Sequence, residues 1–384
     1  MNPVIGIITE YNPFHNGHLY QIKYVRQQYP DAPLVIAMSG NFLERGEPAI
    51  IDKWHRAAEC LDNGADLVME LPLLAVVQPA DRFAYYGIWT LLQMGVTDLF
   101  FGAEHAEYDF LKYAQLVKDV KGDFTKHNES FAKTYQRMIT AKIGHSVVQP
   151  NDLLGLAYAK ADLKLQAHIE LHPLQRKNAN YHDIELEKEG TIASASAIRK
   201  ALFCKEEAVQ KFIPPVTFKD LQTEVLVSWN DLWPYLKYEL LTQSSTELSH
   251  IYGMSEGIQY RMITKAQHSE EATSYDEWIH AVKNKRFTYT RLSRLATMIL
   301  LHVTADEMLE FQTFPYLRIL GFTRKGQQVI HNIKKNIHCP LVTNVSQREM
   351  KTFMKVDYRA GKIYQLVNRV EQDLKRSPIL KAVK

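Results

Sequence analysis

The feature of the sequence that most constrains the fold is an alternation of short apolar runs with helix-length segments over the first 200 residues. Apolar residues on both faces of a strand are typical of a parallel sheet that helices cover on each side. This alternation predicts an α/β fold with right-handed crossovers, in which ligands bind outside the carboxyl ends of the strands. The predicted strands are Val4–Ile8, Leu34–Met38, Asp66–Leu71, Asp98–Phe101 and His168–His172. The predicted helices between them are His18–Gln28, Lys53–Asp62, Arg82–Met94, Phe110–Val120 and Leu153–Lys164.

A pair of prolines interrupts this pattern and predicts a domain boundary. Pro214 and Pro215 follow the alternating region, and the sequence beyond them reads as mainly helical. We therefore expect a parallel-sheet domain over residues 1–213 and a mainly helical domain over residues 214–384. The helices expected in the second domain are Asp220–Trp229, Leu232–Leu241, Tyr275–Lys283 and Thr290–Leu301.

The segment EYNPFHNGHL, residues 10–19, joins the first predicted strand to the first predicted helix. Free N–H groups and a partial positive charge at a helix N-terminus favour an anion, and Gly17 lets a phosphate or a flat base approach the backbone. His15 and His18 are three residues apart, so both can point to one spot and stabilise charge on a phosphoryl group. Helix capping and an HxxH metal pair are the alternatives. No third ligand stands at a suitable spacing, so the residues favour a phosphate site and predict no metal site.

A second segment is expected to open another helix. In SASAIR, Ser194 and Ser196 precede Ile198 and Arg199 after the fifth predicted strand. A helix N-terminus beside an arginine again suits a phosphate. Taken alone, the serines would indicate no more than a helix N-cap.

Together the two segments resemble the HxGH nucleotidyltransferase superfamily. His15 to His18 fill the HxGH motif, Tyr11-Asn12-Pro13 stands where Phe-Asp-Pro is usual, and SASAIR is similar to the second motif of the superfamily. The resemblance implies a Rossmann-like sheet on which ATP is attacked at its α-phosphate.

Further segments resemble the tRNA(Met) cytidine acetate ligase family along the whole chain. They are SGNFLERGEPAIIDKWHRA from residue 39, GADLVMELP from 64, FGAEH from 101, QPNDLLGLAY from 149, RFTYTRLSRL from 286 and LGFTRKGQ from 320. Glu44 and QPAD, residues 78–81, depart from the family pattern but lie outside the HxGH and SASAIR motifs. The resemblance implies that ATP and acetate form acetyl-adenylate and pyrophosphate, with Mg²⁺ as the expected metal ion. The acetyl group would then pass to N4 of the wobble cytidine of elongator tRNA(Met), giving N4-acetylcytidine.

The resemblance also implies a set of ATP contacts, with His15 and His18 as the catalytic residues. On physical grounds, Gly102 leaves room for adenine or ribose, Asn151 can cap a helix or bind a hydroxyl, and Arg176 can pair with a phosphate. The full set of further ATP contacts is Ile7, Ile8, Thr9, Glu10, Tyr11, Asn12, Pro13, Phe14, Asn16, Gly17, Leu19, Tyr20, Gly102, Asn151, Arg176, Ser194, Ser196 and Arg199.

The long polar segment GNFLERGEPAIIDKW, residues 40–54, follows the second predicted strand. We expect it to close over acetyl-adenylate and exclude water, with Arg45, Asp52 and Lys53 as candidate contacts. A helix N-cap is the favoured alternative for Asp52. Adenylation itself needs positioning, Mg²⁺ and cationic donors more than acid–base catalysis.

Charge is distributed unevenly along the chain. Residues 1–214 carry 22 Lys and Arg against 26 Asp and Glu, whereas residues 311–384 carry 15 against 4. A basic segment of this kind indicates a polyanionic partner, most simply nucleic acid. The stretch KNKRFTYTRLSR interleaves cations with Phe287 and Tyr289, which could stack on unpaired bases. The predicted RNA contacts are Lys283, Lys285, Arg286, Arg291, Arg294, Arg324, Lys325, Lys334 and Lys335.

The composition is that of a globular protein, with 46% hydrophobic and 23% charged residues. No apolar run reaches the roughly 20 residues of a membrane span, and no signal peptide precedes the first strand. Cys60, Cys204 and Cys339 are too far apart to suggest a disulfide framework or a zinc site. These observations favour a cytoplasmic protein and give no indication of its oligomeric state.

Two other functions remain compatible with the same residues. One is adenylyl transfer to a small phosphorylated metabolite, against which the long basic second half argues. The other is an RNA-binding protein that holds ATP as a structural ligand without turning it over.

Overall fold

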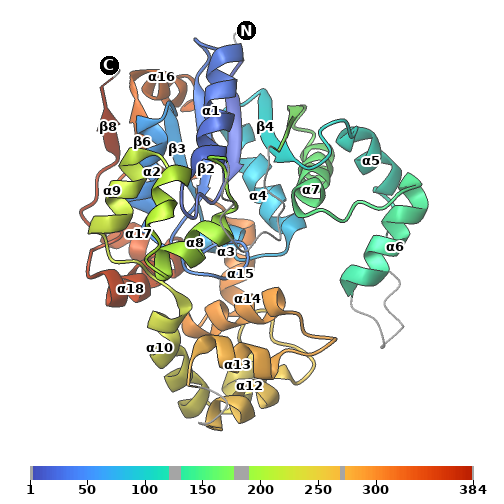
Figure 1. Ribbon diagram of the computed structural model, residues 1–384, viewed down its shortest axis with the longest axis vertical. Coiled ribbons are helices and arrows are strands. Elements are labelled where there is room, and N and C mark those ends of the chain that lie inside the picture. The colour runs from blue at the N-terminus through green and yellow to red at the C-terminus, as the bar shows by residue number, and fades with distance from the viewer. Residues whose placement is uncertain (1–2, 121–130, 177–189, 269–272, 383–384) are drawn as a thin grey trace.

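The computed structural model describes residues 3–120, 131–176, 190–268 and 273–382, which form one eight-stranded sheet with helices around it (Figure 1). Five strands are parallel and lie in the order β5-β4-β1-β2-β3. This is the order of a Rossmann-like half-sheet, whose switch point lies between β1 and β4. The predicted α/β fold is therefore confirmed. The five strands are β1 (Ile5–Thr9), β2 (Leu34–Ser39), β3 (Leu67–Leu71), β4 (Asp98–Ala103) and β5 (Glu170–Gln175).

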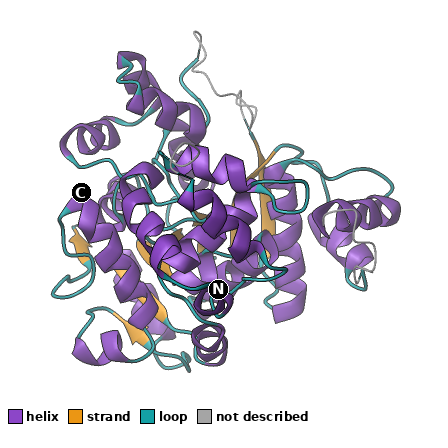
Figure 2. Ribbon diagram, turned by 90° about the horizontal axis from the view of Figure 1, so that it is seen from below, coloured by secondary structure: helices purple, strands orange, loops and turns teal. Residues whose placement is uncertain are grey.

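Alternate residues of the central strands pack into two separate cores, because successive side chains of a strand point to opposite faces. Ile7 and Ile36 belong to the core under α1 (Asn16–Gln28) and α2 (Lys53–Asp62). Ile8 and Ala37 belong to the core under α3 (Leu73–Val76), α4 (Ala80–Gln93) and α7 (Pro150–Leu165). Figure 2, seen from below, shows helices on both sides of the strands. Both faces of the sheet are thus covered, as the apolar runs predicted.

Several elements in this half differ from their predicted bounds or were not predicted, and two of these differences are the largest. The strand expected over residues 168–172 lies at Glu170–Gln175, because Gln166 and His168 adopt left-handed backbone conformations that end α7 and turn the chain. Helix α5 (Phe110–Val117) is followed by α6 (Phe131–Ile143), which the sequence did not predict.

The last part of the chain returns to the sheet. Strand β6 (Leu317–Thr323) pairs antiparallel with β3, and both β7 (Leu341–Val342) and β8 (Ile379–Lys381) pair parallel with β6. The sheet is therefore mixed, although most of its strands are parallel. The expectation of a separate helical domain over 214–384 is wrong for this part, because the apolar run of β6 covers the edge of β3.

The helices between the two parts of the sheet form a body with an aromatic core, in which Trp233, Tyr275 and Trp278 contact one another. The helix expected over Asp220–Trp229 is wrong: α9 ends at Thr223, and a capping box of Ser228 with Asp231 starts α10. The elements before and within the body are α8 (Ala195–Phe203), the 3₁₀ helix η1 (Glu207–Phe212), α9 (Pro215–Thr223), α10 (Trp229–Thr242), α11 (Ser245–Ser249), α12 (Ile258–Gln267), α13 (Tyr275–Val282), α14 (Tyr289–Leu300) and α15 (Ala305–Thr313). Those after β6 are α16 (Arg324–Ile333), α17 (Gln347–Lys351) and α18 (Lys355–Asn368).

None of the helices in the described ranges combines the length and the apolar character that a membrane crossing requires.

Candidate active site

Two adjoining cavities lie at the carboxyl ends of β1 and β4, at the switch point of the sheet. The first has a volume of about 160 Å³ and the second a volume of about 190 Å³. His15, His18 and Arg176 line both cavities, so the two are parts of one site.

Most of the predicted ATP contacts line one of the two cavities. The first cavity is lined by Ile8, Thr9, Gly17, Tyr20, Gly102 and Asn151, together with the three shared residues. The second is lined by Glu10, Asn12, Ser194, Ser196 and Arg199, again with the shared residues. Segments that lie far apart in the sequence, after β1, β4 and β5, therefore meet at one place.

The side chains of six predicted contacts do not line these cavities. Ile7, Tyr11 and Phe14 are almost fully buried in the core under α1, because their positions face that side of the sheet. The Asn16 side chain donates to the carbonyl oxygens of Thr191 and Lys211 at 2.8 and 3.0 Å. The remaining two are Pro13 and Leu19, neither of which contributes to the lining.

The two histidines are both capping residues and cavity residues. His15 is the N-cap of α1, and its Nδ1 accepts a hydrogen bond from the N–H of Gly17 at 3.1 Å. The Nδ1 of His18 accepts from the N–H of His15 at 3.2 Å, and the two rings are stacked with centroids 3.6 Å apart. Since each Nδ1 is an acceptor, the ring proton of each neutral imidazole resides on Nε2. The helix cap thus leaves both Nε2–H groups as hydrogen-bond donors.

Both histidines are held in the neutral form. Burial, together with the positive charge of Arg176, lowers the pKa of His15 to about 3. Burial also lowers the pKa of His18 well below its ordinary value, with contributions from His15 and Arg176. At neutral pH the site therefore presents neutral donors, and its positive charge comes from arginines.

Three arginines, Arg45, Arg176 and Arg199, line the second cavity and supply that charge. Arg176 follows β5 directly, and Arg199 lies in α8, where its Nη1 donates to the carbonyl oxygen of Asn12 at 2.8 Å. Ser194 caps α8 by accepting from the N–H of Ala197 at 3.1 Å. The N-terminus of α8, with its free N–H groups, therefore faces the same cavity as the guanidinium group of Arg199.

Asn151 lies in the first turn of α7 but is not its N-cap, which is Gln149. The Asn151 side chain instead donates to the carboxylate of Glu104, whose other oxygen accepts from the backbone N–H of Asn151 at 3.1 Å. Of the two alternatives for this residue, the structure excludes the cap and leaves the amide at the wall of the first cavity.

Two carboxyl groups, those of Glu10 and Glu47, line the second cavity. Glu10 was among the expected contacts, whereas Glu47 was missed although it stands in the polar segment after β2. The carboxylate of Glu10 accepts from the N–H of Glu44 at 2.6 Å. Burial, with the nearby charge of Glu44, raises the pKa of Glu10 to about 7. Tyr158 of α7 was also missed, because its position reads as part of an apolar helix face.

Of the three candidate contacts in the segment over residues 40–54, only Arg45 lines the second cavity. Asp52 is the N-cap of α2 and accepts from the N–H groups of Trp54 and His55 at 2.9 and 3.0 Å. The expectation that Asp52 and Lys53 contact the substrate is therefore wrong, and the N-cap alternative for Asp52 is confirmed.

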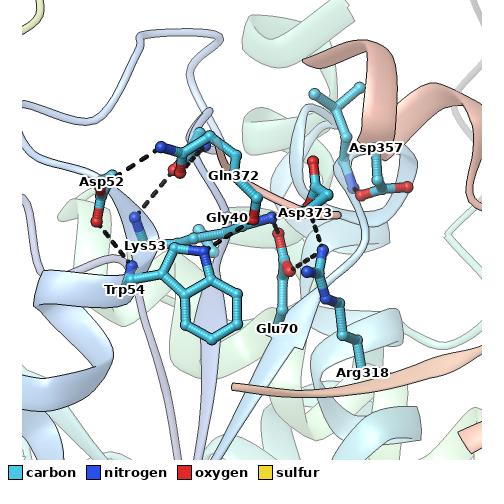
Figure 3. Close-up of polar contacts among 12 residues, drawn as sticks. Gly40, Asp52, Lys53, Trp54, Glu70, Arg318, Asp357, Gln372 and Asp373 are labelled. Carbon is cyan, nitrogen blue, oxygen red and sulfur yellow. Dashed lines mark hydrogen bonds and ion pairs between the residues drawn. The ribbon is translucent and has the colours of Figure 1, made fainter. Parts of the chain in front are cut away.

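Lys53 belongs to a buried cluster of ion pairs beside β2 and β3, at the same carboxyl edge of the sheet as the two cavities (Figure 3). Its Nζ lies 2.8 Å from Glu70 Oε1 and 2.7 Å from Asp373 Oδ1. Arg318 of β6 pairs with the same two carboxylates, and all four side chains are at most 4% exposed. Burial alone would raise the pKa of Asp373, but the charges of Lys53 and Arg318 outweigh it and hold this pKa below its ordinary value.

The predicted RNA contacts fall into two groups at opposite ends of the molecule. Lys283 and Lys285 are exposed between α13 and α14, whereas Lys334 and Lys335 are exposed at the end of α16 (Figure 1). Helix α16 follows β6, whose end pairs with the start of β3, so it lies at the amino edge of the parallel strands. The predicted RNA contacts therefore do not form one continuous basic patch.

Several of the predicted RNA contacts have partners within the protein. Arg294 donates to the carbonyl oxygen of Glu44 at 2.7 Å and pairs with its carboxylate. Arg291 donates to Ser255 at 2.7 Å. Arg286 pairs with Glu256. Arg324 and Lys325 lie in the first turn of α16, and the Nζ of Lys325 is 3.9 Å from the carboxylate of Asp31.

The aromatic residues between these cations are less available than the sequence predicted. Phe287 is only 6% exposed and Tyr289 is partly buried against the core. The prediction that Phe287 stacks on an RNA base is therefore wrong, because its position faces the core of the helical body.

The excess of positive charge after residue 311 is partly used within the fold. Besides Arg318, Lys381 pairs with Asp62 at 2.6 Å, and Lys325 faces Asp31. The basic end of the chain thus complements acidic residues of the first half, so its net charge does not mark a nucleic-acid surface by itself.

One group within the described ranges has metal-ligand geometry: Asp98, Glu170 and His172, at the amino ends of β4 and β5. This edge is opposite the two cavities. His172 stacks on Phe100 with centroids 4.4 Å apart, and its Nε2 lies 2.8 Å from Asp98. His172 thus contacts residues of the neighbouring strand β4.

The chain is similar to known sequences over nearly its whole length. The family model described as HIGH Nucleotidyl Transferase matches residues 1–377. The tRNA(Met) cytidine acetate ligase of Ligilactobacillus salivarius is 52% identical over 379 residues, which is 98% of this chain and 99% of the relative. The protein of the same name from Lactiplantibacillus plantarum is 42% identical over 375 residues, which is 97% of each chain.

Comparison with solved structures agrees. The apo structure of Thermotoga maritima TmcAL superposes with a TM-score of 0.89 at 29% identity, covering 99% of this chain and 100% of that one. The structure of the same protein bound with alpha-thio ATP gives a TM-score of 0.87 at 28% identity, with the same coverage. The likeness therefore extends over sheet, helical body and returning strands together.

Proposed function

The chain belongs to the tRNA(Met) cytidine acetate ligase family of the HIGH nucleotidyl transferases, and from this premise we propose that it activates acetate with ATP and acetylates N4 of the wobble cytidine of elongator tRNA(Met). The observation that carries the proposal is the pair of adjoining cavities that share His15, His18 and Arg176. One cavity suits the nucleoside and the other suits the phosphate chain, and a solved relative is bound with an ATP analogue.

The nucleoside part of ATP is assigned to the first cavity. Gly102 leaves this wall open, since the nearest atom to a Cβ built there is 3.6 Å away on Arg176. Phe101, Leu154 and Tyr158 give the cavity an apolar side for a base, while the Asn151 amide is available to a hydroxyl.

Adenylation takes place where the cavities join. An acetate oxygen forms a bond to the α-phosphorus, the bond from that phosphorus to the bridging oxygen breaks, and pyrophosphate leaves. The Nε2–H groups of His15 and His18 donate to phosphoryl oxygens, and Arg176 and Arg199 balance the charge of the pyrophosphate. Because both histidines are neutral and already oriented by the cap, they stabilise charge without giving up a proton.

Mg²⁺ fits the same region, because Glu10 and Glu47 bring carboxylate oxygens to the phosphate cavity and Mg²⁺ prefers oxygen ligands. These two residues would hold the ion, through water or directly, together with phosphate oxygens. When bound, the ion supplies positive charge to the leaving pyrophosphate.

Acetyl transfer follows at the second cavity. The cytidine N4 forms a bond to the acetyl carbonyl carbon, the bond from that carbon to the phosphate oxygen breaks, and AMP leaves as N4 loses a proton. The helical body adjoins this place, since Arg294 of α14 contacts the segment that carries Arg45 and Glu47. Lys283 and Lys285, exposed before α14, are the proposed contacts to the RNA backbone there. A tRNA substrate also agrees with the proposed cytoplasmic location.

The test uses protein, labelled acetate, ATP and a tRNA(Met) transcript. We expect AMP and pyrophosphate to form, and the label to be recovered in RNA as N4-acetylcytidine by mass spectrometry. Without RNA, acetate should still promote ATP–pyrophosphate exchange. Absence of label from RNA would exclude the proposed transfer, and absence of exchange would exclude the proposed activation.

A further inference from the structure

A groove between α4, α5, α7 and α15 carries side chains that neither proposed chemical step uses. Its volume is about 1090 Å³, larger than the two cavities of the site together. Helices α4 and α7 pack against each other along it, and Ala157 and Ala161 of α7 keep its floor open.

One side of the groove is aromatic. Tyr85 and Trp89 lie one turn apart on α4, so they share a helix face about 6 Å apart along the axis. Both are partly exposed, and Tyr86 lies deeper beside them at 8% exposure. Partly exposed aromatic rings in a row offer stacking surfaces to planar groups.

The other side is cationic. Lys160 and Lys164 lie one turn apart on α7, Lys118 stands at the end of α5, and Arg82 at the start of α4. Among the described residues that line the groove, one carboxylate faces these four cations: Asp81, which pairs with Lys160 at 2.9 Å. The lining therefore keeps a positive charge.

The aromatic and cationic rows lie side by side. The Nζ of Lys164 is 4.8 Å from the centroid of the Tyr85 ring. Two adjacent rows, one of rings and one of cations, complement a polymer that repeats a planar base and a phosphate. An acidic peptide would satisfy the cations but would leave the rings without planar partners.

We propose that this groove binds a strand of the substrate RNA outside the nucleotide that is acetylated, with bases on the aromatic row and phosphates on the cationic row. The proposal rests on the proposed function, since that function supplies the RNA. Helix α7 connects the groove to the active site. Asn151 and Tyr158 line the first cavity, and Lys164 in the groove lies about 20 Å along the helix from Asn151. At the other end, Arg82 donates to the hydroxyl of Tyr252 in the helical body at 2.7 Å.

The test measures affinity for a tRNA(Met) transcript as a function of salt. We expect the double substitution Lys118→Ala/Lys164→Ala to raise Kd about tenfold and to lower the slope of log K against log salt by about 1.4 to 1.8, because two phosphate contacts are lost. Tyr85→Leu keeps an apolar side chain and should raise Kd about fivefold without changing that slope. Thermal unfolding of each variant checks that it is folded.

The matched control is Lys23→Ala/Lys351→Ala, which removes the same charge from two exposed lysines that line neither the groove nor the two cavities and should leave the slope unchanged. A groove variant whose Kd and slope match this control would overturn the proposal. Acetate-dependent ATP–pyrophosphate exchange without RNA should be equal in all variants. If the wild-type protein lacked this exchange, the proposed function would fail, while the binding measurements would still decide whether the groove holds RNA.

Discussion

The carboxyl edge of the parallel strands has two halves with opposite properties. Beside β1, β4 and β5 it is open, and neutral histidines and arginines line cavities. Beside β2 and β3 it is closed, because Arg318 and Asp373 cover Lys53 and Glu70. The same kinds of polar residue therefore serve a ligand site in one half and hold the fold together in the other.

The difference shows what makes a polar residue at this edge functional. In the open half, hydrogen bonds from the backbone use one nitrogen of each imidazole and leave the other for a ligand. In the closed half, each charge has an opposite charge within the protein. Position at the carboxyl end of a strand is thus necessary for the site but does not by itself make one.

The largest expected effect is on the closed half. Lys53→Met leaves Glu70 and Asp373 with less compensating charge in a buried place, so we expect the free energy of unfolding to fall by about 3–5 kcal/mol. Denaturant unfolding measures it. Lys381→Met is the control, because its pair with Asp62 is about one-third exposed and should contribute at most about 1 kcal/mol. Equal losses in the two variants would contradict the assignment of Lys53 to a buried cluster.

The corresponding change in the open half should affect catalysis. His18→Gln preserves an acceptor for the N–H of His15 but removes the rigid ring that holds an N–H donor at the Nε2 position, because the amide nitrogen of Gln shares its carbon with the acceptor oxygen. We expect acetate-dependent ATP–pyrophosphate exchange to fall about 10²–10³-fold, while the unfolding free energy changes by less than about 1 kcal/mol. A variant with normal exchange would show that the imidazole does not stabilise the reacting phosphoryl group. Retained tRNA binding with lost exchange would exclude a purely RNA-binding protein.

Two glycine-to-alanine substitutions compare the closed and the open half by the space available for a methyl group. A Cβ at Gly361 would lie 2.0 Å from Asp373 Oδ2, so Gly361→Ala should cost about 1–3 kcal/mol of stability through overpacking. A Cβ at Gly102 would meet no atom closer than 3.6 Å, so Gly102→Ala should leave stability within about 0.5 kcal/mol. It should instead raise the KM for ATP several-fold, because the methyl group enters the first cavity. Thermal unfolding and exchange kinetics at varied ATP separate the two effects.

A pH dependence of stability is also expected in the open half. Burial raises the pKa of Glu10 from 4.5 to about 7, so the folded state binds a proton more tightly than the unfolded state. The stability that this proton contributes is complete below pH 4.5 and is lost as pH rises through 7. Glu10→Gln removes this dependence.

Its unfolding free energy relative to wild type should therefore increase between pH 4.5 and 7 and level off above. Denaturant midpoints in a pH series measure the difference. A constant difference across the series would show that the Glu10 carboxyl is not desolvated.

The open half was predictable because much of it is local in sequence. The spacing of His15, Gly17 and His18 encodes the helix start, the caps and the donors within four residues. The meeting of Arg176 and Arg199 with this segment required more than local pattern, and family resemblance supplied it.

The closed half was not predictable in the same way. Lys53 looked like a ligand contact because its partner Asp373 stands more than 260 residues later in the sequence, as does Arg318, which pairs with the same two carboxylates. The prediction that Phe287 stacks on a base was wrong for a related reason. Its neighbours in the sequence are basic, but its packing partners come from other helices. Residue type and spacing predict local geometry, whereas burial depends on which distant segment arrives to cover a residue.

The return of β6 to the edge of β3 has a consequence for biosynthesis. On the ribosome, β3 emerges roughly 250 residues before the strand that pairs with it, and about 300 before Asp373. During that interval the nascent chain presents an unpaired strand edge, and the pair of Lys53 and Glu70 lacks the opposite charges of Asp373 and Arg318. Closure of the sheet is thus deferred until almost the whole chain has been made, and a polypeptide that stops short of β6 retains the nucleotide motifs on an unfinished sheet.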